Sequence, residues 1–94
     1  MTPNELIRCL LHDRPVGVVR YGDLQSAFMQ VAGYTREGAK GSWRSLVHVA
    51  HNTPLTLWDE TVRGQPLRTK YIERAAKHLK AVYANGGFSE PTDP

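Results

Sequence analysis

The residues best suited to chemistry are cations set among glycines at the front of the segment 35–52. They are Arg36, Lys40 and Arg44, with Gly38 and Gly41 between them. Glycines allow the backbone to approach a phosphate closely, and Arg and Lys side chains can then reach past it. The spacing therefore predicts a surface that binds a polyanion. We expect Arg36 and Lys40 to clamp phosphates and Arg44 to reach a base.

A second group of cations follows further along the chain. Arg63, Arg68 and Lys70 surround the turn-forming residues Gly64, Gln65 and Pro66. Cations on a tight turn are typical of contacts to a phosphate backbone. The formal net charge of +3 favours an acidic partner.

Catalytic patterns are missing from the sequence. His48 and His51 are three residues apart, but neither a cysteine nor a carboxylate accompanies them at metal-ligand spacing, so we expect no metal site. The doublet Asp59-Glu60 is expected to be a surface pair rather than a catalytic dyad. No phosphate-binding loop, dinucleotide fingerprint or Ser/His/Asp arrangement occurs, which predicts a protein that is not an enzyme and needs no cofactor.

Cys9 is the only cysteine, so no internal disulfide can form. It lies in an apolar run and is expected to be a buried, inert thiol. One thiol and no apolar run of membrane-spanning length predict a cytoplasmic protein without a membrane partner.

The element expected to carry the first cations is a helix within 35–52. Its apolar face would be Trp43, Leu46, Val47 and Ala50, which recur at i, i+3, i+4 and i+7. Two starts are compatible with the sequence. A start at Thr35 includes the glycines, whereas a start at Ser42 leaves 35–41 as a basic loop. Phe28 and Trp43 are expected to be core anchors.

The other elements follow from caps, breaks and periodicity. Thr2, Pro3 and Glu5 begin a first helix that ends before Pro15. A short strand or extended connector then leads to a helix over 22–33. A β-hairpin turning at Gly64 is expected over 55–69, and a last helix over 71–84. The chain therefore reads as one domain, 1–88, followed by a flexible tail, 89–94.

This order resembles that of a winged helix-turn-helix DNA-binding domain. The expected fold class is mainly α with a small β-hairpin. The resemblance implies that the 35–52 helix enters the major groove of double-stranded DNA and that the 55–69 hairpin contacts the backbone. The DNA-binding residues would then be Arg36, Lys40, Ser42, Arg44, Arg63, Arg68 and Lys70.

A second resemblance concerns the segment 18–24, Val-Val-Arg-Tyr-Gly-Asp-Leu. It is similar to the start of the DNA-binding domain of O6-alkylguanine alkyltransferases and alkyltransferase-like proteins, and the segment 44–54 is similar to their helix before an Asn-Pro step. Here Thr53 separates Asn52 from Pro54, and the Pro-Cys-His-Arg motif is absent. Alkyl transfer needs a thiolate at that motif, so the resemblance implies DNA binding without that chemistry.

Three functions remain open from the sequence. The first is a small transcriptional regulator that binds DNA, with a homodimer on a two-fold site as one expected form. The second is a protein-interaction module, such as a small phage- or plasmid-type antagonist, that uses the same basic face on an acidic protein. RNA binding ranks third, because it requires exposed aromatic rings and Trp43, Trp58 and Tyr71 are expected to face the core.

Overall fold

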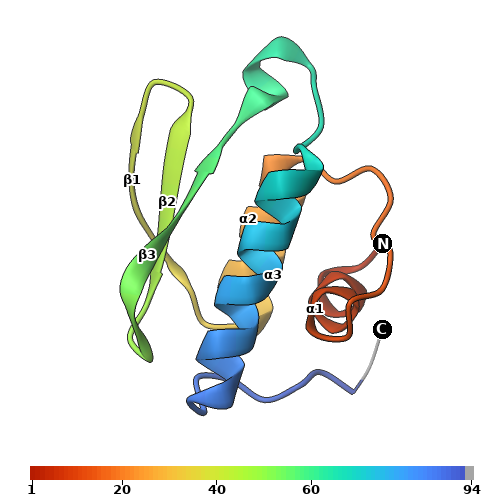
Figure 1. Ribbon diagram of the computed structural model, residues 1–94, viewed down its shortest axis with the longest axis vertical. Coiled ribbons are helices and arrows are strands. Elements are labelled where there is room, and N and C mark those ends of the chain that lie inside the picture. Colours follow the sequence, from red (N-terminus) through yellow and green to blue (C-terminus); the bar gives the residue numbers. More distant parts are fainter. Residues whose placement is uncertain (93–94) are drawn as a thin grey trace.

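The structure is a computed structural model that describes residues 1–92 (Figure 1). It contains three α-helices, one short 3-10 helix and a three-stranded antiparallel sheet. In chain order the elements are α1 (Pro3–Leu11), α2 (Tyr21–Val31), β1 (Thr35–Lys40), β2 (Trp43–His48), β3 (His51–Trp58), η1 (Glu60–Arg63) and α3 (Thr69–Ala84). The fold class is therefore mixed α and β, and the expectation of a mainly α protein is only partly confirmed.

The helices at the two ends of the chain lie where the sequence predicts them. The hydroxyl of Thr2 accepts a hydrogen bond from the backbone N–H of Glu5, and the Glu5 carboxylate accepts one from the backbone N–H of Thr2. This capping box satisfies N–H groups that have no partner inside the helix. In α3, buried side chains recur at the spacing of one helical face, including Ala75, Leu79 and Val82.

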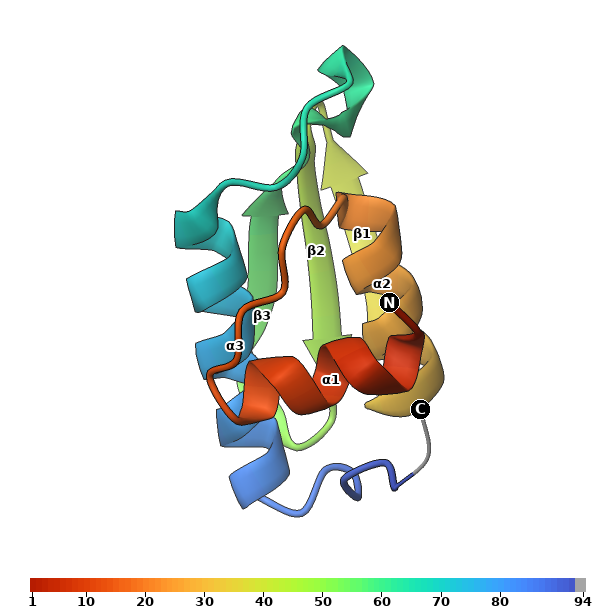
Figure 2. The same ribbon diagram turned by 90° about the vertical axis from the view of Figure 1, so that its right-hand side faces the viewer.

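The molecule has three layers. Helices α2 and α3 lie side by side against one face of the sheet, and α1 crosses both of them on the side away from the sheet (Figures 1 and 2). The opposite face of the sheet has no helix over it (Figure 1). The core lies between the sheet and the helices.

The prediction of a recognition helix over 35–52 is wrong. This segment forms β1, β2 and the beginning of β3, in the strand order β1-β2-β3. Arg44, Leu46 and His48 point towards the helices, and Leu46 and His48 are buried. The apolar residues therefore alternate as in a β-strand rather than following the helical spacing. The strand is favoured because cross-strand partners such as Leu55 and Leu57 complete the buried face. The structure therefore lacks the recognition helix that a winged helix-turn-helix would have at this position.

Gly41 makes the first reversal of the chain possible. It has φ of +59° and stands with Ser42 in the two-residue turn between β1 and β2. Primed hairpin turns require a positive φ at this position, which a residue without Cβ adopts readily. The glycine that suggested a phosphate loop is therefore the turn of a β-hairpin.

The prediction of a β-hairpin over 55–69 is also wrong. Its first arm is the end of β3, but Glu60–Arg63 forms η1, and the expected second arm is irregular chain up to Thr69, where α3 begins. Gly64 does reverse the chain, with φ of +75°, as the cap of η1. The Asp59 carboxylate accepts from the backbone N–H of Thr61 at 2.8 Å, which favours the 3-10 turn over continued strand.

The two edges of the sheet differ. The outer edge of β3 faces α3, where the carbonyl oxygen of Thr53 accepts from His78 and that of Thr56 accepts from Arg74. All six residues of β1 are exposed. The pairing of β1 with β2 shifts register between Arg36 and Gly38, which marks a β-bulge.

Two further expectations concern side-chain burial. Phe28 is fully buried in the core, as predicted, whereas Trp43 is 39% exposed, so its expected role as a core anchor is wrong. In the expected tail, Glu90 pairs with His12, the C-cap of α1, and the carbonyl oxygen of Pro91 accepts from Arg8 of α1 at 3.4 Å. Residues 93 and 94 of that tail lie outside the described residues.

Candidate nucleic-acid interface

Aromatic rings and cations gather where the β1–β2 turn, η1 and the start of α3 meet. The ring of Trp43 packs edge-on against that of Trp58, with centroids 5.0 Å apart, and against that of Tyr71 at 6.2 Å. Trp43 is paired across the hairpin with Lys40. We call this region the cation–aromatic surface; its members are Lys40, Trp43, Trp58, Arg63, Arg68, Lys70, Tyr71 and Arg74.

Two of these cations, Lys70 and Arg74, lie against the ring of Tyr71. The ammonium of Lys70 lies 5.0 Å from the centroid of the Tyr71 ring and the guanidinium of Arg74 lies 5.2 Å from it. Such stacking holds a charged group in place without neutralising it. Arg74 also donates to the carbonyl oxygen of Thr56 at 3.1 Å, which fixes it beside the sheet.

Two carboxylates lie among these five cations: that of Glu37, which shares a hollow with Lys40 and Trp43, and that of Glu60. The Glu60 carboxylate forms a 2.8 Å ion pair with Arg68, and its side chain is mostly buried while that of Arg68 is exposed. The surface therefore keeps a surplus of positive charge. In addition, α3 begins at Thr69 without a side-chain cap and without an acid in its first turn. The positive end of the helix dipole adds to the same potential.

A recess of about 240 Å³ opens within this surface. Trp58 and Tyr71 line it together with Glu60, Arg63 and Arg68. Trp58 is partly buried and Tyr71 almost fully, so the rings form the walls and the two guanidinium groups supply the charge. An aromatic wall beside cations is suited to a planar ring that carries a negative group.

The structure brings together four of the seven residues predicted to bind DNA. Lys40, Arg63, Arg68 and Lys70 belong to the cation–aromatic surface. Arg36 and Arg44 lie elsewhere, in a separate hollow lined also by Tyr21 and Gln25 of α2. Ser42 stands in the β1–β2 turn, where its carbonyl oxygen accepts from the backbone N–H of Asp59 at 2.7 Å.

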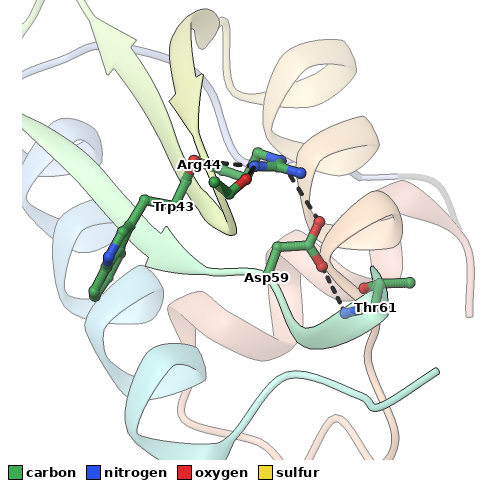
Figure 3. Close-up of polar contacts among 5 residues, drawn as sticks. Trp43, Arg44, Asp59 and Thr61 are labelled. Carbon is green, nitrogen blue, oxygen red and sulfur yellow. Dashed lines mark hydrogen bonds and ion pairs between the residues drawn. The ribbon is translucent and has the colours of Figure 1, made fainter. Parts of the chain in front are cut away.

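Arg44 is tied into the protein at the base of the β1–β2 turn. Its guanidinium donates to the carbonyl oxygens of Gly41 at 2.6 Å and Trp43 at 3.1 Å, and its Nε lies 3.6 Å from the Asp59 carboxylate (Figure 3). The side chains of Arg44 and Trp43 point in opposite directions (Figure 3). These contacts give Arg44 a role in holding the turn against the start of η1, on the side of the sheet that faces the helices.

A histidine cluster lies at the other end of the sheet. The Tyr34 hydroxyl bonds to Nδ1 of His78 at 2.7 Å, and His78 Nε2 donates to the carbonyl oxygen of Thr53 at 2.6 Å. The ring of His51 stands edge-on to that of His78, with centroids 4.4 Å apart. Burial lowers the pKa of His78, the Thr53 carbonyl opposes this shift, and the neighbouring imidazoles of His51 and His48 lower the pKa further.

Sequence reasoning missed the exposed ring of the interface. Of the three rings expected to face the core, Tyr71 is buried in it and Trp58 packs against it, as predicted, whereas Trp43 is 39% exposed; Arg74 was not singled out. The available signal was the position of Trp43 and Trp58, each within five residues of a cation that the sequence marked for binding, Lys40 and Arg63. That signal becomes readable only when the two tryptophans are known to be cross-strand partners.

Comparisons of the chain with known proteins find no match. No protein-family model matches the chain, and no curated protein or solved structure matches it either. Within residues 1–92, no three His, Cys, Asp or Glu side chains are grouped so that they could hold a metal ion. None of the helices in this part of the chain combines the length and apolar character needed to cross a bilayer.

Proposed function

We propose that this chain is a non-enzymatic DNA-binding protein that uses the cation–aromatic surface in place of a recognition helix. The observation that carries the proposal is the grouping of five cations with two carboxylates, those of Glu37 and Glu60, beside an exposed Trp43. Unneutralised Arg and Lys side chains on one face are the basis of phosphate binding. A small cytoplasmic transcriptional regulator is the role that this proposal implies.

The β1–β2 hairpin is the element that we propose for the DNA groove. The major groove of B-DNA admits a two-stranded β-ribbon as well as an α-helix. Lys40 stands at the end of this hairpin, next to the turn, and Arg63 and Lys70 lie on neighbouring elements where they can contact phosphates. A homodimer would present two such hairpins to a two-fold site. The hairpin then takes the part that a helix plays in a winged helix-turn-helix.

An unpaired nucleic-acid strand, RNA included, is the second candidate. Trp43 is 39% exposed, while the edge contacts of its ring are with Trp58 and Tyr71. Exposed aromatic rings beside cations allow bases to stack, and stacking contributes roughly 1–3 kcal/mol per base. Of the three rings whose expected burial argued against RNA, Tyr71 is buried but Trp43 is exposed, and Trp43 is the ring that supports this candidate.

Binding assays with labelled duplex and single strands of equal length test the proposal. At about 50 mM salt we expect binding that weakens steeply by about 200 mM, because released counterions oppose binding as salt rises. Duplex competitor should displace the probe if the ribbon enters a groove, and single-strand competitor if bases stack on Trp43.

The matched variants are Arg63→Ala and Arg14→Ala. Both residues are exposed arginines, but Arg14 lies beside the groove between α1 and α3, away from the cation–aromatic surface. Arg63→Ala should weaken binding and Arg14→Ala should leave it unchanged. Absence of binding to any nucleic acid at low salt would overturn the proposal and favour an acidic protein as the partner.

A further inference from the structure

The recess beside Trp58 has the size and lining of a site for one small ligand. Its volume of about 240 Å³ lies below the roughly 300–1,000 Å³ of pockets that enclose drug-sized molecules. It can therefore accept a single planar ring but not a stacked pair of bases. Trp58 is partly buried and offers apolar contact to such a ring, and the almost fully buried Tyr71 lines the same recess.

The two arginines of the recess differ in what they already bind. Arg68 is held by Glu60 at 2.8 Å, so that pair contributes little net charge and sets one boundary of the recess. Arg63 forms no ion pair with any residue between 1 and 92, although it lines the same recess. The Arg63 guanidinium is thus the donor left for an anion, and its planar fork matches the oxygens of a phosphate.

An aromatic wall and a cation in one recess define a ligand with a ring and an adjacent anion. We infer that the recess binds one nucleoside monophosphate unit, with its base against Trp58 and its phosphate at Arg63. This inference rests on the proposed function and makes it more specific. A terminal phosphate carries a charge of about −1.5 to −2 near neutral pH, more than the single charge of an internal phosphodiester, so the end of a strand suits the site.

Two sources supply this chemistry: a free nucleotide and the unpaired 5′-terminal nucleotide of a strand. Tryptophan fluorescence separates them. Trp43 and Trp58 are the only tryptophans in the chain, so a Trp43→Phe background leaves Trp58 as the sole reporter. Because Trp43 belongs to the proposed interface, oligonucleotide binding is also measured on the unsubstituted chain. The ligands are adenosine monophosphate, adenosine, inorganic phosphate, and a short single-stranded oligonucleotide with and without a 5′-phosphate.

We expect adenosine monophosphate to quench Trp58 and to bind at least about tenfold more tightly than adenosine or phosphate, because each of these lacks one of the two contacts. Arg63→Gln should weaken it by roughly tenfold, while Arg14→Gln should not change it. A thermal melt of each variant shows that the fold is intact. Tighter binding of the 5′-phosphorylated oligonucleotide than of free nucleotide identifies a strand end as the source, and equal binding with and without the 5′-phosphate identifies free nucleotide.

Other outcomes overturn the inference. Equal affinity for adenosine and its monophosphate would exclude a phosphate contact, and unchanged affinity in Arg63→Gln would exclude the assigned residue. Salt-sensitive oligonucleotide binding without any response of Trp58 to the monophosphate would reject the recess and keep the proposed function. Monophosphate binding without oligonucleotide binding would keep the recess and reject the proposed function.

Discussion

The hydroxyl of Tyr34 donates a hydrogen bond to Nδ1 of His78, 44 residues further along the chain, across 2.7 Å in the protein interior. Burial lowers the pKa of His78, so the ring is neutral at neutral pH. In the neutral ring Nε2 carries the hydrogen, because it bonds to the carbonyl oxygen of Thr53 and a carbonyl can only accept, and Nδ1 is left to accept from Tyr34. Both nitrogens of His78 are therefore satisfied. The bond joins the segment before β1 to the middle of α3, across the core.

Replacing Tyr34 with Phe should destabilise the protein by about 1–3 kcal/mol, because it leaves a buried ring nitrogen without a donor. Urea denaturation at neutral pH measures the change in the free energy of unfolding. The control is Tyr83→Phe, which removes the same hydroxyl from a side chain that is 43% exposed and should change stability by less than about 0.5 kcal/mol. Equal effects of the two substitutions would contradict the assignment.

Acidification should destabilise the protein through His78. The pKa of His78 is lowered in the folded state, mainly because the ring is buried. The unfolded state therefore binds the proton more readily than the folded state. The free energy of unfolding should therefore fall as pH decreases from the ordinary histidine value of about 6.5 towards the lower folded value, and stay constant above that range. Urea denaturation at about pH 7.5 and about pH 5 measures it. His78→Gln should reduce this dependence, and an unchanged dependence would exclude His78 as its source.

Phe28 and Trp43 should differ sharply on truncation to Ala. Phe28 is fully buried, so Phe28→Ala should cost about 3–5 kcal/mol of stability. Trp43 is partly exposed, and Trp43→Ala should cost distinctly less while it weakens nucleic-acid binding. Thermal melting and a binding titration of both variants provide the comparison. A Trp43→Ala protein with full binding would remove this ring from the proposed interface.

Arg44 and Arg63 should separate stability from binding. Arg44→Ala removes the contacts to Gly41 and Asp59 and should lower the melting temperature, with a cost of about 1–3 kcal/mol. Arg63→Ala should leave melting nearly unchanged and reduce the slope of log affinity against log salt by about one, the value expected for one lost phosphate contact. If Arg44→Ala instead weakened binding and Arg63→Ala lowered the melting temperature, Arg44 would again be the residue expected to contact a base.

The helices could be predicted from the sequence because their signals are local. The capping box at Thr2 and Glu5, the breaking residue Pro15 and the periodic stripe of α3 each act within a few turns of chain. Each signal has a physical effect that does not depend on distant residues. These elements accordingly begin and end within two residues of the predicted bounds, apart from the end of α1, which stops at Leu11 rather than just before Pro15.

The segment 35–52 could not be assigned in the same way, because its partner is distant. Trp43, Leu46 and Val47 match a helical stripe, and Leu46 and His48 match a strand alternation equally well. Pairing of β2 with β3 decides between them, and no local pattern encodes it. The same non-local pairing brings Trp43 beside Trp58, so the candidate interface could be predicted in its cations but not in its rings.

The exposed edge of β1 also limits how copies of this protein can meet. A β-bulge at Glu37 and the charges of Arg36 and Lys40 interrupt a strand that would otherwise offer a continuous row of backbone partners to a neighbouring molecule. Natural sheets use bulges and edge charges to prevent such joining. Any self-association of this chain should therefore leave the sheet at three strands, and the protein should resist fibril growth through this edge when it is concentrated.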